Sequence, residues 1–279
     1  MSRALDVDRR SFLRAAGIAA AGAWLGAIPA RAVAPAALDR EETALRGSDP
    51  DRLGPFALGR PLQRNALASA GDVRGFRLEG QAQISFPEGR LRLANALDPA
   101  LGQKSNFVYW FDRELPEDFA AGWDFWPIRD PGLCMVFFGA RARRGGDIFA
   151  PGLKARTGEY AQYHHGEIDT LHLSYFRRSR PMERDFQVCN LRKSYGFHLV
   201  AEGADPLPPV REAAPPYRVE LVKCGAEVAF FIDRLPVLRW TDDGRAYGPV
   251  LGAGRFGFRQ MAPLIAEYGN FTVREVRRA

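Results

Sequence analysis

The sequence predicts an all-β protein, a jelly-roll sandwich of two antiparallel sheets. Short apolar or alternating runs recur about every dozen residues, and Gly, Pro, Asp and Asn separate them. Several late runs alternate apolar and polar side chains, which is typical of strands with one buried face. No long stretch beyond residue 32 has the period of an amphipathic helix.

The expected strands begin near Phe76 and continue to the end of the chain. The runs of the first half are Phe76–Leu78, Ala82–Phe86, Leu91–Ala94, Phe107–Phe111, Trp123–Ile128 and Cys134–Phe138. The runs of the second half are Tyr217–Lys223, Glu227–Ile232, Leu235–Trp240, Arg255–Gln260 and Phe271–Val276. Tight turns are expected to join the first three of these late runs into an antiparallel meander. Pro236 lies inside one run, so that strand is expected at a sheet edge or at a bulge.

The first 32 residues have the three parts of a signal peptide. Arg9-Arg10 precedes Ser-Phe-Leu, an apolar run follows, and Ala30-Arg31-Ala32 is a small-x-small cleavage pattern. The paired arginines resemble a twin-arginine signal, which would make the twin-arginine translocase a partner during export. The apolar run is shorter than the roughly 20 residues that span a membrane. We therefore expect a periplasmic or secreted protein without stable membrane insertion.

The remaining chain is interpreted as a tether and entry segment over residues 33–60 and one jelly-roll domain over residues 61–279. Without the five arginines and two aspartates of the signal, its net charge is +3 rather than +6. This mild excess forms no concentrated basic stripe, so no nucleic acid partner is expected. Three cysteines cannot all pair, and Cys134, in an apolar run, is expected in the core. One disulfide stays possible.

Residues 159–200 contain the groups best suited to chemistry. All four histidines lie there: His164, His165, His172 and His198. On a strand, Glu167 and Asp169 would share one face at roughly 6–7 Å, a separation that suits a pair of glycosidase carboxylates. Strict alternation places His172 on the other face, and a one-residue bulge near Thr170-Leu171 would return it beside the acids. Glu167, Asp169 and His172 are the expected catalytic group. Alternatively, the two acids pair with nearby arginines.

A second group mixes hydrogen-bond donors with aromatic rings, as sugar-binding sites do. The expected substrate-binding residues are Trp126, His164, Asn190, Arg192, Tyr195, His198, Arg259 and Gln260. Arg192 could hold a uronate carboxylate through two hydrogen bonds. Core packing explains Trp126 equally well. No standard zinc spacing is present, so no metal or other cofactor is expected.

Three segments resemble the YesU-like family of the concanavalin A-like lectin/glucanase superfamily. They are Phe125-Trp126-Pro127 through to Pro131-Gly132-Leu133-Cys134-Met135, Cys189-Asn190-Leu191-Arg192-Lys193-Ser194-Tyr195-Gly196-Phe197-His198, and Gly257-Phe258-Arg259-Gln260-Met261-Ala262-Pro263. The resemblance covers about residues 75–277 and implies a jelly-roll sandwich, a link to polysaccharide use and a possible structural calcium. The pattern Glu167-x-Asp169-x-x-His172 is similar to the Glu-x-Asp-x-x-Glu of jelly-roll glucanases, with His172 in place of the proton-donating acid.

Three functions stay open at this point. The first is glycoside hydrolysis, with Glu167 or Asp169 as base or nucleophile and His172 as acid. The second is β-elimination of a uronate glycan, in which a His or Tyr removes the C5 proton and Arg192 or Asn190 neutralises the carboxylate. The third is a non-catalytic glycan-binding lectin. The sequence favours an exported protein that binds and cleaves a polysaccharide or oligosaccharide, and this requires the acids, His172 and Arg192 to converge on one concave sheet.

Overall fold

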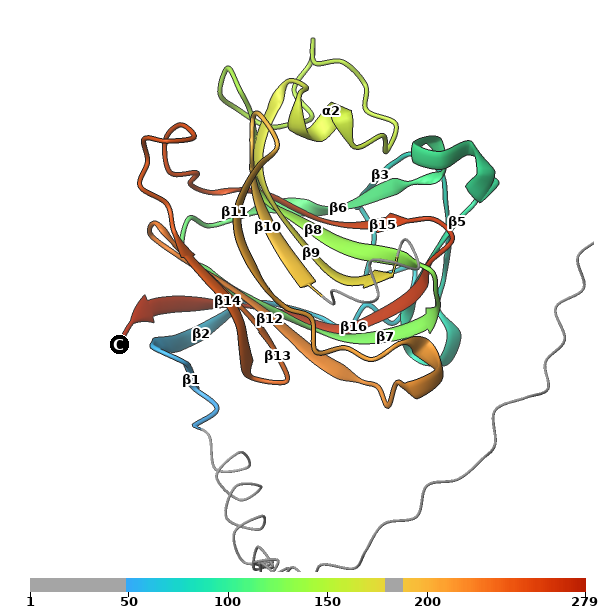
Figure 1. The fold of residues 1–279 in the computed structure, drawn as a ribbon, viewed down its shortest axis with the longest axis horizontal. Helices are drawn as coiled ribbons and strands as arrows, with labels where there is room; N and C mark the ends of the chain where they lie inside the picture. The colour runs from blue at the N-terminus through green and yellow to red at the C-terminus, as the bar shows by residue number, and fades with distance from the viewer. Residues whose placement is uncertain (1–48, 179–187) are drawn as a thin grey trace, which may run out of the picture. The chain divides into compact units, whose positions relative to one another are not determined.

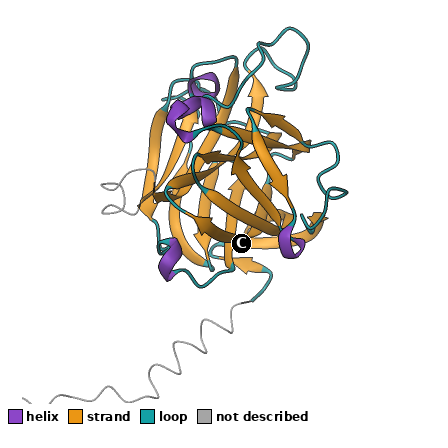
Figure 2. Ribbon diagram, turned by 90° about the vertical axis from the view of Figure 1, so that its right-hand side faces the viewer, coloured by secondary structure: helices purple, strands orange, loops and turns teal. Residues whose placement is uncertain are grey.

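A computed structural model describes residues 49–178 and 188–279, which form two sheets stacked face to face (Figures 1 and 2). Every pairing between the named strands of this part is antiparallel. The predicted sandwich of two antiparallel sheets is confirmed. The expected signal peptide and residues 33–48 of the expected tether lie outside the described residues.

Sheet A has nine strands in the described part of the chain, and seven of them follow the order β1-β2-β16-β7-β12-β13-β14. Strand β5 joins this sheet by pairing with β16, and β4 pairs with β5. The strands are β1 (Arg52–Leu53), β2 (Phe56–Asn65), β4 (Ala82–Ser85), β5 (Leu91–Asn95), β7 (Phe119–Arg129), β12 (Tyr217–Cys224), β13 (Glu227–Ile232), β14 (Leu235–Thr241) and β16 (Ile265–Arg278).

Sheet B has seven strands in the described part, in the order β11-β10-β9-β8-β15-β6-β3. They are β3 (Arg77–Glu79), β6 (Phe107–Leu115), β8 (Gly132–Ala142), β9 (Ile168–Arg178), β10 (Val188–Ser194), β11 (His198–Ala204) and β15 (Gly254–Met261). The helical elements are short: α2 (Ala161–His164) and the 3-10 turns η1 (Pro87–Gly89), η2 (Pro99–Ser105) and η4 (Val210–Glu212).

Aromatic rings fill much of the space between the sheets. Strand β7 alternates, so Trp123 and Phe125 point into this core from sheet A. Phe258 of sheet B stacks on Tyr268 of sheet A with ring centroids 4.3 Å apart. Such pairs add to the burial of apolar surface that holds the layers together. Cys134 is buried here, as expected, and all three cysteines are free thiols.

The sequence predicts the strand that contains Pro236 better than it predicts the start of sheet A. Residues 52–60 belong to the expected tether and entry segment, but β1 and the first half of β2 lie in this range, and β2 pairs with β16. The run of β2 lacks regular alternation, and only its first residue, Phe56, is fully buried. The expectation for Pro236 is confirmed: β14 is the last strand of sheet A, and its register with β13 shifts near this residue.

Half of the outer face of sheet B, the face turned away from sheet A, lies under residues 143–167. We call these residues the covering segment; it includes α2 and lies above sheet B in Figure 1. Trp110 and Phe137 of the sheet pack with Ile148 and Tyr163 of the covering segment in a second buried apolar cluster. This cluster fixes the segment against the sheet by removing apolar surface from water.

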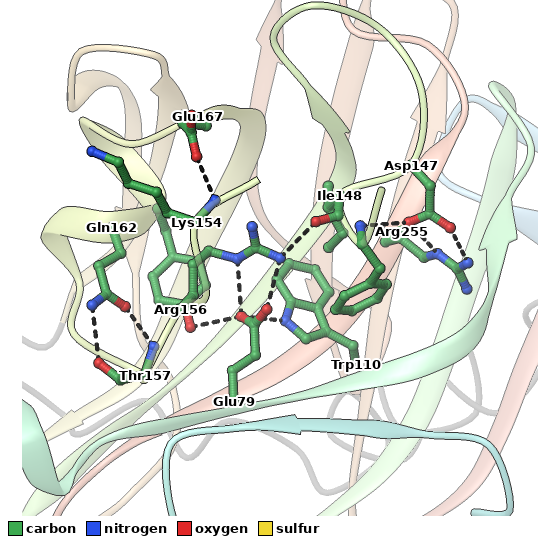
Figure 3. Close-up of polar contacts among 12 residues, drawn as sticks. Glu79, Trp110, Asp147, Ile148, Lys154, Arg156, Thr157, Gln162, Glu167 and Arg255 are labelled. Carbon is green, nitrogen blue, oxygen red and sulfur yellow. Dashed lines mark hydrogen bonds and ion pairs between the residues drawn. The ribbon is translucent and has the colours of Figure 1, made fainter. Parts of the chain in front are cut away.

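The carboxylate of Glu79, on edge strand β3, ties the covering segment down (Figure 3). It accepts hydrogen bonds from Trp110 Nε1 at 2.9 Å and from Tyr163 Oη at 2.8 Å. Arg156 Nη2 lies 2.7 Å from Glu79 Oε1 in a nearly buried ion pair and also donates to the Ile148 carbonyl at 2.9 Å. One charge therefore joins two strands, the loop and α2.

Replacing Glu79 by Gln should destabilise the protein by about 3–5 kcal/mol, because Arg156 would be left buried without its anion. Urea unfolding measures this loss. The matched control is Glu275→Gln, which breaks the exposed Arg60–Glu275 pair and should cost less than about 1 kcal/mol. Equal losses in the two variants would contradict the role assigned to Glu79.

Candidate functional site

A pocket of about 90 Å³ opens on the outer face of sheet B, beside the covering segment. Tyr160 of that segment forms one side. The polar residues of the sheet that line it are His172, Ser174, Arg177, Asn190 and Arg192. A larger cleft of about 360 Å³ lies elsewhere, along β2, β7, β12 and β16 of sheet A, and none of the expected site residues lines it.

The register of β9 and β10 brings the polar residues together. His172 lies directly across from Arg192, and Ser174 lies across from Asn190. These residues alternate with Leu171, Leu173 and Leu191, which point into the core. The sequence therefore places its outward polar groups on two neighbouring strands, next to the edge strand β11.

His172 is buried between two hydroxyl groups. Its Nδ1 lies 2.9 Å from Tyr160 Oη, and its Nε2 lies 2.6 Å from Ser194 Oγ. Burial lowers the pKa of His172 well below 6.5, and the positive charges of Arg192 and Arg259 lower it further. The imidazole is therefore neutral at physiological pH, with one nitrogen that donates and one that accepts.

Arg259, on β15, lies fully buried behind Tyr160. Its guanidinium stacks on the Tyr160 ring at 4.6 Å, and Nη2 donates to Gln103 Oε1 at 3.1 Å. Its Nε and Nη1 have no hydrogen-bond partner within the described residues, and no carboxylate there forms an ion pair with it. A close approach of the loop makes this contact possible: Gly158, at φ +93°, lies so near the Asn106 carbonyl that a Cβ would stand 2.1 Å from the oxygen.

Two further arginines stand at the pocket. Arg192 stacks on the Phe197 ring at 4.0 Å and donates to the Phe197 carbonyl at 3.2 Å. With the Asn190 amide oriented as its neighbours require, its oxygen accepts from Arg177 Nη1 at 3.1 Å and its nitrogen donates to Glu202 Oε1 at 3.1 Å. None of the described residues that line the pocket is an acid. The charged side chains among these lining residues are thus arginines, which suits the pocket to an anion.

The structure separates the expected catalytic acids from His172. Strand β9 pairs with β10 in an unbroken register from Thr170 to Ser174, so the bulge expected near Thr170-Leu171 is not there. The register shift lies between Phe138 and Arg141 of β8 instead. Asp169 and His172 therefore lie on opposite faces of the strand.

Both acids have other partners. Asp169 forms an ion pair with Arg143 at 3.6 Å, which agrees with the alternative that the acids pair with nearby arginines. Burial raises the pKa of Asp169, while Arg143 opposes this shift. Glu167 accepts the backbone N–H of Lys154 at 2.7 Å and so closes the covering segment (Figure 3). Neither acid lines the pocket with His172.

Two expected binding residues are placed away from this face. Trp126 alternates in phase with Ala120 along β7, so it lies on the outer face of sheet A. It packs there on Gly269 and under the Arg90 guanidinium. Gln260 points into the core, where its Nε2 donates to Tyr268 Oη at 2.8 Å. These two expected binding residues therefore do not share a face with Arg259. Gln260 is its neighbour on β15 and faces the opposite way, and Trp126 lies on the other sheet.

The remaining expected residues do not line the pocket themselves. His164 packs on Phe197 with ring centroids 4.5 Å apart, and burial lowers its pKa to about 4. Tyr195 is exposed under the Arg143 guanidinium at 3.9 Å, on the side of Asp169. His198 stacks on Tyr247 at 4.2 Å. Only His164 of these three packs against a ring that lines the pocket.

Sequence reasoning missed Tyr160, Arg177 and Ser194 as members of the site. Ser194 has the outward parity of Arg192, and that signal was available. Arg177 has the opposite parity from His172, and it reaches the pocket because the register of β9 against β8 shifts between Tyr175 and Arg178, where Phe176 has φ +48°. Tyr160 precedes α2 in a loop, and no local pattern indicates where a loop side chain will rest.

The described ranges contain no cluster of three or more His, Cys, Asp or Glu side chains placed to hold a metal ion. Among the same residues, no helix has the length and apolar content needed to cross a bilayer.

Comparisons with known proteins give the following matches. The family model "Domain of unknown function (DUF1961)" matches residues 60–273. The uncharacterized protein YesU of Bacillus subtilis (strain 168) is 51% identical over 220 residues, which are 79% of this chain and 98% of YesU. A crystal structure of a B. subtilis protein of unknown function with a galectin-like fold has a TM-score of 0.77 and 50% identity, and the match covers 80% of this chain and 100% of that one.

A more distant match is the κ-carrageenase of Pseudoalteromonas carrageenovora, in complex with an oligotetrasaccharide of κ-carrageenan. Its TM-score is 0.50 and its identity 8%, over 83% of this chain and 100% of that one, so this likeness shows the fold alone. Together with the galectin-like structure, it confirms the expected jelly-roll architecture of concanavalin A-like proteins. The resemblance to YesU-like proteins is likewise confirmed.

The neutral state of His172 predicts a dependence of stability on pH. In the unfolded chain a histidine takes up a proton near pH 6.5, whereas folded His172 does not, so the free energy of unfolding should fall as the pH drops below about 6.5. The loss approaches about 1.4 kcal/mol per pH unit. Urea unfolding between pH 7.5 and about pH 5 should show this slope in the wild type and a shallower one in His172→Gln. Parallel slopes would contradict a buried neutral imidazole.

Proposed function

This chain belongs to the family described as domain of unknown function DUF1961, and from its pocket we propose that it binds an acidic glycan on the outer face of sheet B. The single observation that carries this proposal is a pocket lined by Arg177 and Arg192, with no acid among its described lining residues and with the buried Arg259 behind Tyr160. Guanidinium groups recognise carboxylates and sulfates through paired, charge-assisted hydrogen bonds.

Three observations support a glycan as the ligand. The rim carries the aromatic rings of Tyr160 and Phe197 beside the Asn190 amide, a combination that suits a sugar ring and its hydroxyl groups. The same fold occurs in the κ-carrageenase that was crystallised with an oligosaccharide. An exposed pocket of modest size also suits one residue of a longer chain better than a compact enclosed ligand.

Cleavage is the second candidate, and the Tyr160–His172–Ser194 hydrogen bonds favour it, since a pure lectin needs no such proton-exchanging group. Hydrolysis with Glu167 and Asp169 has less support. A glycosidase needs its two carboxyl groups on either side of one bond, and neither of these acids lines the pocket with His172. Binding without cleavage remains the lectin alternative.

Binding can be tested by isothermal titration calorimetry with three oligosaccharides of similar length: an oligogalacturonate, a κ-carrageenan oligosaccharide and a neutral malto-oligosaccharide. We expect binding of at least one anionic probe, weaker at high salt, and none of the neutral one. Arg192→Gln should weaken this binding about tenfold or more, because a hydrogen-bonded charge pair is worth about 1.5–3 kcal/mol.

The matched control is Arg211→Gln. Arg211 is an exposed arginine on η4 that pairs with its neighbour Glu212, and its loss should leave affinity unchanged. Preference for the neutral probe, or equal effects of the two substitutions, would contradict an anion-binding pocket. The carboxylated and sulfated probes distinguish the two sources of negative charge.

We also propose that the protein acts outside the cytoplasm, after export by the twin-arginine route. The support is the Arg9-Arg10 pair with its apolar run and its Ala30-Arg31-Ala32 cleavage pattern. An acidic polysaccharide is too large to enter a cell unaided, so this location agrees with the proposed ligand.

Replacing both Arg9 and Arg10 by Lys should retain the protein in the cytoplasm at full length, since the translocase reads the arginine pair and not its charge alone. Cell fractionation with an antibody measures this. The control Arg3→Lys lies outside the pair and should leave export intact. Export of the double variant at the wild-type level would contradict the proposed route.

A further inference from the structure

The pocket offers proton transfer and positive charge but no lining acid within the described residues. A uronate sugar can be cleaved with such groups. Its C5 hydrogen lies next to the carboxylate, and cations that hold the carboxylate stabilise the negative charge that develops when this proton leaves. Arg192 and Arg177, on β10 and β9, line the wall where a carboxylate would bind.

We propose that the protein cleaves uronate glycans by β-elimination, with Tyr160 as the catalytic residue that takes the C5 proton and returns it to the leaving oxygen. This inference rests on the proposed function, because it requires an acidic glycan in the pocket. His172, Ser194 and Arg259 are positioning residues that act through Tyr160.

Tyr160 is the group left to meet the sugar. The side chain of His172 is buried, and both of its ring nitrogens are already in contact with hydroxyl groups, at 2.9 Å and 2.6 Å. The Tyr160 hydroxyl lies at the end of this chain of contacts, on a side chain that is part-exposed and lines the pocket. It can therefore face both the imidazole and a ligand.

The hydrogen-bond chain can support either form of the phenol. A neutral imidazole donates from one nitrogen and accepts at the other. When Ser194 Oγ donates to Nε2, the proton of His172 sits on Nδ1 and donates to the Tyr160 oxygen, which stabilises a phenolate. When the tautomer is reversed, the phenol donates to Nδ1. The two directions match the two states that a proton-exchanging tyrosine must visit.

The buried guanidinium of Arg259 places a positive charge against the Tyr160 ring. It is fully buried, stacks on the Tyr160 ring at 4.6 Å, and has no carboxylate partner within the described residues. An unpaired buried guanidinium is costly, so its retention here calls for a negative group close by. A phenolate on Tyr160 would provide part of that charge at the moment of reaction.

The step balances in atoms and electrons. The Tyr160 phenolate takes the proton from C5, and the electrons of the C5–H bond form a double bond between C4 and C5. The C4–O4 bond breaks with its electrons on O4, and the tyrosine hydroxyl gives its proton to that oxygen. Tyr160 ends as the phenolate with which it began. No water is consumed, and the reaction needs no oxidant or reductant.

The pH dependence follows from the groups that face Tyr160. These are His164 of α2, His172 and Arg177 of β9, Arg192 of β10 and Arg259 of β15. Burial raises the pKa of Tyr160 to about 12, and the three arginines oppose this rise. The phenolate is scarce at neutral pH, so the rate should increase about tenfold per pH unit between roughly pH 7 and 9.

The test uses the purified protein with polygalacturonate and alginate, two polyuronates, and measures ultraviolet absorbance and reducing ends together. Elimination raises both, because the new double bond is conjugated to the carboxylate. Tyr160→Phe should lower the rate by about 10²–10⁴-fold while calorimetric affinity changes less than about twofold. Tyr247→Phe, an exposed tyrosine outside the pocket, is the matched control and should leave the rate unchanged.

A second variant separates positioning from folding. His172→Gln should reduce kcat by about tenfold to a hundredfold with little change in KM, while the rise of the rate with pH persists, because Tyr160 is still present. A purely structural role for His172 would instead raise KM or lower the folded fraction. Circular dichroism confirms that each variant is folded.

The outcomes are distinct. Absorbance that depends on Tyr160 supports the inference. Reducing ends without absorbance, or a glycan that binds without being cleaved, would overturn elimination, and a fully active Tyr160→Phe variant would overturn the role of Tyr160. Each of these results would leave acidic-glycan binding intact. Binding confined to the sulfated oligosaccharide would likewise overturn it, since that sugar has no carboxylate beside C5. Failure of all anionic probes to bind would overturn the proposed function itself.

Discussion

The carboxylate of Glu79 is the constraint on which the site depends. A charge this deeply buried must be fully hydrogen-bonded, and its partners come from β6, from the loop and from α2 through Trp110, Arg156 and Tyr163. The hydrogen bonds that the Glu79 carboxylate accepts fix the covering segment on the sheet. Tyr160 lies one helical turn before Tyr163, so the same contacts set where its ring rests. The position of Tyr160, to which we assign the proton transfer, thus depends on a charge on edge strand β3.

Two arginines, one in the covering segment and one that contacts it, differ in their partners. Arg156 is neutralised by Glu79 and holds structure together, whereas Arg259 is just as buried and has no acid partner within the described residues. Folding alone does not explain the second arrangement, because an unpaired buried cation opposes stability. A group kept at such a cost is better explained by what it does to its neighbours. It lies against Tyr160 and lowers the pKa of His172.

Most of the fold could be predicted from the sequence, because period-two alternation is a local signal. Runs such as Glu227–Ile232 coincide with a strand of the structure. The site was predictable only in part. Alternation correctly placed Asp169 and His172 on opposite faces, but the expected bulge does not occur in β9, and which strand of a pair takes a register shift depends on its neighbours. Tyr160 could not be placed, since its position follows from Glu79, which is distant in sequence.

The outer face of sheet B divides into two halves, and alternation explains the division. On β6 and β8 the outward residues are apolar, among them Val108, Trp110 and Phe137, so they must be covered. On β9 and β10 the outward residues include His172 and Arg192, which need no apolar cover. The covering segment therefore stops where the polar half begins, and Tyr160 stands at that border. In the proposed mechanism, the glycan would lie along the polar half, towards β11, with the sugar that reacts next to Tyr160.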